Sequence, residues 1–89
     1  MEKTLEGLFA ISKSGHDKDK LYVIVREDNE YVYVADGKLK LLDNPKKKNK
    51  KHIQIIKKKA IEVIAHEAQV RTDSITNNEE IKRAIKLYR

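Results

Sequence analysis

The chain has 89 residues, 39% of them hydrophobic and 38% charged, which is enough for one domain with a modest core. It contains no cysteine, which excludes disulfides and thiolate metal sites, and its three histidines lack metal-ligand spacing. Residues 1–7 have no signal-peptide apolar centre, and the longest apolar run, residues 21–25, is far too short to cross a membrane. We therefore expect a folded cytoplasmic protein with no membrane attachment, cofactor or bound metal.

Positive charge is concentrated in one quarter of the chain. The net charge is +6, and residues 36–60 alone hold ten Lys/Arg and two acidic residues, a balance of +8. The other residues balance to −2. Localised positive charge of this kind is typical of a surface that binds a polyanion.

Three strands are expected in the first 35 residues. Residues 8–13 and 21–26 are rich in aliphatic and β-branched side chains, and residues 31–35 alternate aromatic with aliphatic side chains. The polar loop at residues 14–20 contains Gly15, which can take a positive φ. The alternation in the third strand would send its valines to one face of the sheet and its tyrosines to the other.

Two more strands are expected around the lysines. Asp36-Gly37 predicts a type I′ hairpin turn into a strand at residues 38–41, with lysines on one face and leucines on the other. Pro45 would end the sheet at this point, since proline has no N–H to donate, and residues 52–56 would form a fifth strand. Five short strands with tight connections predict a small barrel, which closes on itself and leaves no edge.

The C-terminal third changes to a helical period. Apolar residues spaced i, i+3, i+4, i+7 predict one helix around residues 61–68 and a second around residues 81–88. Thr76 as N-cap and Glu79 fit a capping box for the second helix, and residues 69–75 would form the loop before it. The expected class is mainly β with C-terminal α, a five-stranded SH3-like barrel followed by two short amphipathic helices.

Lys57, Lys58 and Lys59 conflict with this helix assignment. They lie at or just before the N-terminus of the first helix, where cations are unfavourable. Either the fifth strand continues through these lysines, or they serve an external anion.

The apolar positions of these elements define the expected core. The strands would contribute Ile11, Val23, Val25, Val32, Val34, Leu39, Leu41, Ile53 and Ile55. The helices would add Ile61, Ile64, Ile81 and Ile85.

Residues 7–54 resemble a known family. The run Gly7-Leu8-Phe9-Ala10-Ile11-Ser12-Lys13-Ser14-Gly15-His16-Asp17-Lys18 looks like a KOW motif, which residues 21–25 continue. Matching segments follow at residues 34–42, at Asn44-Pro45-Lys46-Lys47-Lys48 and at His52-Ile53-Gln54. Together they resemble the KOW-domain RNA-binding proteins of Firmicutes-type bacteria, which are similar to KOW-containing large-subunit ribosomal proteins of archaea and eukaryotes. One position departs, because the family usually has a glycine where Asp19 stands.

The resemblance implies a fold, a function and partners. It implies a translation-protein SH3-like barrel, which we place at residues 1–56. The C-terminal helices match the family only in general character, and we expect residues 57–89 to form a helical extension packed on the barrel. It also implies a non-catalytic protein that binds RNA, with ribosomal RNA of the large subunit as the expected partner and ribosomal proteins as further ones.

The candidate RNA-binding surface has two parts. The cluster at residues 46–51 would neutralise phosphates and release counterions, and the loop at residues 13–20 would line the RNA backbone. The alternatives are a solvated surface for the cluster and, for the loop, lysines neutralised by Asp17 and Asp19. The candidate residues are Lys13, Gly15, His16, Lys18, Lys20, Lys38, Lys40, Lys46, Lys47, Lys48, Lys50, Lys51 and His52.

Tyr31 and Tyr33 allow two interpretations. They could stack on unpaired bases of single-stranded RNA. We favour the other interpretation, in which they are packing residues, for example against the C-terminal helices.

Catalysis is not expected. The sequence has no cysteine nucleophile, no phosphate-cradling glycine loop and no paired-carboxylate motif. The alternative functions are an SH3-like protein-interaction module and, with less support, peripheral binding to anionic membranes.

Overall fold

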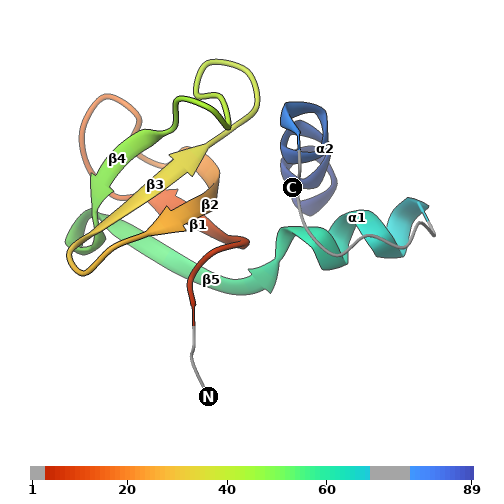
Figure 1. The fold of residues 1–89 in the computed structure, drawn as a ribbon, viewed down its shortest axis with the longest axis horizontal. Coiled ribbons are helices and arrows are strands. Elements are labelled where there is room, and N and C mark those ends of the chain that lie inside the picture. Colours follow the sequence, from red (N-terminus) through yellow and green to blue (C-terminus); the bar gives the residue numbers. More distant parts are fainter. Residues whose placement is uncertain (1–3, 69–76) are drawn as a thin grey trace.

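The chain folds into one antiparallel sheet with two helices against it (Figure 1). This computed structural model describes residues 4–68 and 77–89, and the side chains of residues 66–68 are outside that description. The sheet order is β4-β3-β2-β1-β5. The elements are β1 (Leu8–Ser12), β2 (Leu21–Glu27), β3 (Tyr31–Ala35), β4 (Lys46–Asn49), the 3₁₀ turn η1 (Lys50–His52), β5 (Ile53–Lys59), α1 (Ala60–Ala68) and α2 (Asn78–Tyr88). The expected class, mainly β with C-terminal helices, is confirmed.

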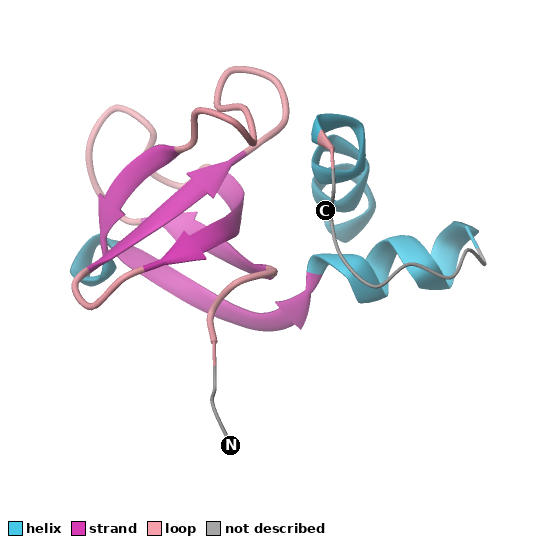
Figure 2. Ribbon diagram, viewed as in Figure 1, coloured by secondary structure: helices cyan, strands magenta, loops and turns pink. Residues whose placement is uncertain are grey.

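Both faces of the central strand are buried, which explains the uninterrupted apolar run of β2. Leu21 and Val23 lie in a cluster that the two helices complete, whereas Tyr22 and Ile24 lie in a second cluster on the other face. A strand buried on both sides reads as continuously apolar. We call the two clusters the helix-side core and the inner core, and the curved sheet separates them (Figure 2).

The two helices cover one end of the helix-side face. Ala60 and Ile64 of α1, with Ile81 and Ile85 of α2, join the buried cluster. Phe9 of β1 belongs to the same cluster, and its ring stacks on Tyr88 at 4.5 Å between centroids. The apolar face predicted from the i, i+3, i+4, i+7 spacing is therefore correct for α2. For α1 it is correct at Ile64.

The N-cap of α2 is Asn77, whose side chain accepts a hydrogen bond from the backbone N–H of Glu80. The prediction named Thr76 instead. Thr76 and the expected loop at residues 69–75 lie outside the described residues.

The predicted hairpin strand at residues 38–41 is wrong. Its backbone forms a tight turn, because the carboxylate of Asp36 accepts hydrogen bonds from the N–H groups of three successive residues, Lys38 to Lys40, at 2.8–3.0 Å. The leucines of the turn consequently point away from the core, and Leu39 is 79% exposed. A side chain that caps local amides competes with strand pairing, and here it prevails.

The fourth strand lies instead within the lysine cluster. β4 follows Pro45 directly and pairs with β3, so that Lys48 lies opposite Val32 and Lys46 opposite Val34. Pro45 therefore precedes a strand rather than ending the sheet. The fifth strand does continue through Lys57–Lys59, which resolves the conflict at the start of α1.

The expected core is correct for most positions. Val23, Val32, Val34, Ile53, Ile64, Ile81 and Ile85 are buried. Ile11, Val25, Ile55 and Ile61 are half-buried, whereas Leu39 and Leu41 are exposed. The prediction missed Ala10, Tyr22 and Ile24, because it assumed that only one face of each strand is buried. It also missed Phe9 and Leu21, although they lie on the same face as Ile11 and Val23.

The sheet is open in its strand pairing. β4 and β5 are its two edge strands, and η1 connects them in the chain. The sheet is therefore curved but not closed by a ladder between its edges (Figure 2).

Candidate nucleic-acid interface

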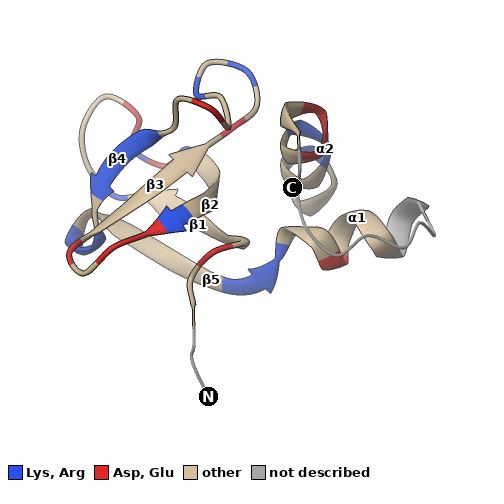
Figure 3. Cartoon of the chain, viewed as in Figure 1, with Lys and Arg blue, Asp and Glu red and all other residues tan. Residues whose placement is uncertain are grey.

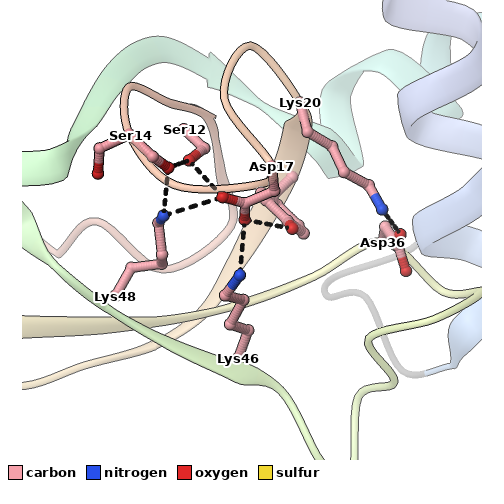
Figure 4. Close-up of polar contacts among 8 residues, drawn as sticks. Ser12, Ser14, Asp17, Lys20, Asp36, Lys46 and Lys48 are labelled. Carbon is pink, nitrogen blue, oxygen red and sulfur yellow. Dashed lines mark hydrogen bonds and ion pairs between the residues drawn. The ribbon is translucent and has the colours of Figure 1, made fainter.

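The carboxylate of Asp17 joins the two parts of the predicted surface (Figure 4). Its Oδ1 accepts from Ser12 Oγ at 2.9 Å and from Lys48 Nζ at 3.1 Å. Its Oδ2 accepts from Tyr22 Oη at 2.7 Å and from Lys46 Nζ at 3.0 Å. The loop between β1 and β2 is thus fastened to β4 by charge-assisted hydrogen bonds.

These contacts shift two pKa values. Burial raises the pKa of Asp17, but the hydrogen bonds from Tyr22, Lys46, Lys48 and Ser12 outweigh it and hold the pKa well below its usual range. Burial and the neighbouring carboxylate of Asp17 raise the pKa of Tyr22 above its ordinary value. The group is therefore an ionised carboxylate beside a neutral phenol.

Lys48 is a structural residue rather than a free cation. Its side chain is 9% exposed and also donates to the backbone oxygen of Ser14 at 3.1 Å. Burying an ammonium group requires a counter-charge, and Asp17 supplies it. The alternative interpretation of the sequence was that Asp17 neutralises lysines of its own loop. In the structure the lysines that pair with Asp17 belong to β4.

The loop itself needs two left-handed residues. Gly15 has φ +84° and Asp19 has φ +73°. The N–H of Asp19 donates to the oxygen of Ser12 at 2.7 Å, which closes the loop. The backbone of Asp19 adopts the conformation that glycine takes most easily.

Two more candidate lysines are held by carboxylates. Lys20 pairs with Asp36, and Lys50 pairs with Glu27 at 3.0 Å. Burial raises the pKa of Asp36, but Lys20 and the backbone amides of the turn lower it to about 2. The backbone N–H of Leu5 and the Lys50 ammonium lower the pKa of Glu27.

The remaining candidates of these two segments are exposed. Lys13, Gly15, His16 and Lys18 lie on the β1–β2 loop side, and Lys47, Lys51 and His52 lie on β4 and η1. The N–H of Lys13 donates to the oxygen of His52 at 2.8 Å, so the β1–β2 loop adjoins η1, whereas the Lys47 side chain lies over the ring of Tyr31. We use the name lysine surface for Lys13, Lys18, Lys47 and Lys51, which have no carboxylate partner in the part of the chain that the structure describes.

Charge is concentrated where these segments meet. Residues 13–20 and 46–52 together contain eight lysines and two aspartates, a balance of +6 that equals the net charge of the whole chain. One of the two aspartates, Asp17, is enclosed by its donors. The exposed lysines are therefore not compensated by that carboxylate.

Other basic residues do not join this surface. Lys38 and Lys40 lie in the turn beside α2, and Lys57–Lys59 lie at the far end of β5 (Figure 3). Lys38 and Lys20 line a hollow of about 260 Å³ between the turn and α2, together with Lys82, Lys86 and Arg89. The lysines of residues 36–60 are thus divided among three places.

The sequence did not single out Arg26, which the structure places beside the two tyrosines. The guanidinium of Arg26 lies 4.3 Å from the ring centroid of Tyr33, and Lys47 Nζ lies 4.2 Å from that of Tyr31. Both rings are half-buried and neither belongs to the core that the helices complete. The packing partners of the tyrosines are therefore cations of the neighbouring strands rather than the helices.

Comparison of the sequence with protein-family models finds no matching family, and comparison with curated proteins finds no match either.

Two further features bear on function. No group of three or more potential metal ligands occurs within the described residues, where His16 and His52 lie on the surface. Of the helices in the described part of the chain, none has the length and apolar character needed to cross a membrane.

Proposed function

We propose that this protein binds RNA without catalysis, through contacts between the lysine surface and backbone phosphates. The observation that supports this most is the charge balance of the two joined segments, in which the central carboxylate is enclosed and the outer lysines are free of carboxylates. Phosphate contacts by lysine release counterions and provide affinity without reading sequence.

The resemblance to KOW proteins supports the same proposal. It implies an SH3-like barrel, and the observed part of that expectation is a curved five-stranded antiparallel sheet that is not closed. On this basis the RNA is the ribosomal RNA of the large subunit, ribosomal proteins are neighbours, and the protein acts in the cytoplasm. Crosslinking the protein to cellular RNA and sequencing the products tests the identity of the RNA.

The binding test removes the four charges of the lysine surface. A variant with Lys13, Lys18, Lys47 and Lys51 replaced by glutamine should bind a structured RNA more weakly. Its log–log dependence of affinity on salt should be less steep by about 3, since each phosphate contact contributes roughly 0.7–0.9. Affinity would be measured by fluorescence anisotropy at several salt concentrations.

The matched control removes four charges elsewhere. The control variant carries glutamine at Lys57, Lys58, Arg83 and Lys86, which are exposed and have no carboxylate partner in residues 4–65 and 77–89. It should keep the wild-type salt slope. Equal losses in both variants would mean that net charge alone acts, and the proposed surface would be wrong.

Replacing every lysine of residues 46–51 would be a less specific test of RNA binding than this variant. Lys46, Lys48 and Lys50 are bound to carboxylates, so reversing their charge would also disturb the fold. A binding defect in such a variant would not report on RNA contacts.

A protein-interaction module is the second candidate, and the exposed Leu39 favours it. Leu39 adjoins a hollow that Leu21 and Ile85 also line. Salt distinguishes the two candidates, because docking of an apolar side chain is not weakened by salt as phosphate contacts are.

A further inference from the structure

Three neighbouring strands align a row of side chains on the outer face of the sheet. Arg26 of β2 lies opposite Tyr33 of β3, and Tyr33 lies opposite Lys47 of β4. Tyr31 shares this face, since it lies two residues from Tyr33 along the strand. We call Arg26, Tyr31, Tyr33 and Lys47 the tyrosine row.

A β-bulge creates this row. Tyr22 and Ile24 face the inner core, so strict alternation would turn Arg26 inward as well. The pairing of β2 with β3 shifts register between Ile24 and Arg26, which moves Arg26 to the outer face opposite Tyr33. Bulges commonly redirect a side chain beside a functional site.

The helices leave this part of the face uncovered. Ala35 has the same orientation on β3 as the tyrosines, and it is buried in the core that the helices complete. Farther along the strand, Tyr31 and Tyr33 remain half-exposed, and Arg26 and Lys47 are exposed. The same face therefore changes from an apolar contact at one end to aromatic rings with cations at the other.

Arg26 and Lys47 would not prevent a nucleic-acid base from stacking on the tyrosine rings. An exposed cation–π contact is weaker than the stack of a nucleic-acid base on an aromatic ring, so a base can replace the cation. The displaced guanidinium or ammonium group then remains close enough to contact the phosphate of the same nucleotide.

The spacing of the rings selects the class of nucleic acid. Side chains two residues apart on a strand are separated by about 6.7 Å, whereas stacked bases are separated by about 3.4 Å. Two successive bases can lie on both rings only if they are unstacked from each other. A duplex, whose bases are stacked, cannot provide this geometry.

We propose that the tyrosine row binds two unpaired nucleotides of single-stranded RNA, with Tyr31 and Tyr33 stacking on the bases and Arg26 and Lys47 contacting phosphates. This inference rests on the proposed RNA binding and specifies which RNA conformation the protein prefers.

The test compares an unstructured RNA octamer with a duplex of the same sequence. Replacing both tyrosines by leucine keeps an apolar side chain on the strand but removes the π faces. This variant should bind the octamer at least tenfold more weakly than the wild type and bind the duplex within twofold of it. Replacing both by phenylalanine should preserve octamer binding, and circular dichroism verifies the fold of each variant.

The outcomes separate the two proposals. Wild-type binding to neither RNA would overturn both. Wild-type binding with an unchanged octamer affinity in the leucine variant, or with equal losses for octamer and duplex, would overturn only the stacking proposal. Loss of octamer binding in the phenylalanine variant as well would also overturn it, because phenylalanine retains the ring.

Discussion

At the scale of single residues, three carboxylates decide which lysines are free. Asp17, Glu27 and Asp36 each accept from ammonium groups, and together they hold Lys20, Lys46, Lys48 and Lys50. A lysine run in a sequence gives no sign of this division. The exposed members of the run can bind an external anion, whereas the paired members stabilise the fold.

Asp36 predicts a pH dependence of stability. Its pKa falls from 3.8 to about 2 on folding, so folding favours the carboxylate form. The resulting stabilisation, on the order of 2 kcal/mol, is complete above pH 3.8 and is lost as the pH falls through 2. Urea unfolding at pH values between 5 and 2 should show this loss.

The variant Asp36→Asn isolates the charge from the turn. Its amide oxygen can still accept from the backbone N–H groups of the turn, but it cannot titrate or pair with Lys20. The variant should therefore be less stable at pH 7 and lose less stability on acidification. An unchanged acid profile would show that Asp36 does not contribute to it.

At the scale of elements, the turn after β3 and the helix α2 form one unit. The side chain of Asn78 accepts from the N–H of Leu42 at 2.7 Å. Gly37 has φ +78° and faces α2 so closely that a Cβ there would overlap the backbone oxygen of Asn78 and lie 2.8 Å from Lys82 Cγ. The glycine of the predicted hairpin is needed, but for contact with a helix rather than for a type I′ turn.

The variant Gly37→Ala should be strongly destabilising. Gly7 is the matched control, because it has φ +88° and no atom within 4 Å of an added Cβ. Gly7→Ala should lower the free energy of unfolding by about 1 kcal/mol, the cost of a left-handed alanine. Gly37→Ala should lower it by about 2–4 kcal/mol, because the overlap with α2 adds to that cost. Equal effects in denaturant titrations would refute the close packing of turn and helix.

At the scale of the whole molecule, the helix-side core couples the helices to the sheet. Ile81 of α2 is fully buried in the cluster that contains Phe9, Leu21 and Val23 of the sheet. Unfolding of α2 would expose these strand residues to water. The helices and the sheet should therefore unfold together.

The variant Ile81→Ala tests this coupling. It should lower the free energy of unfolding by about 2–5 kcal/mol, as is usual for a large-to-small change in a core. The helical signal in circular dichroism and the tyrosine signal should still change in one coincident transition. Leu39→Ala is the control and should change stability by less than about 0.5 kcal/mol, because Leu39 is exposed. Separate transitions would show that the helices are an independent unit.

Local sequence patterns were sufficient for much of the architecture. Composition and periodicity identified β1, β2, β3 and both helices, since strand and helix periods are short-range properties of the chain. Charge counting located the excess positive charge in residues 36–60. The left-handed position at Asp19 was not predicted, because aspartate does not signal a positive φ as glycine does.

Tertiary structure decided which of these residues act together. Asp17 meets Lys46 and Lys48 across 29 and 31 positions of sequence, and no local pattern encodes so distant a partner. Likewise, the bulge in β2 depends on pairing with β3, and it alone brings Arg26 beside Tyr33. The sequence by itself determined where most strands, both helices and the positive charge occur, but not the fourth strand. Only the folded chain decided which lysines are neutralised and which face the solvent, because that choice depends on strand register and on carboxylates far away in the chain.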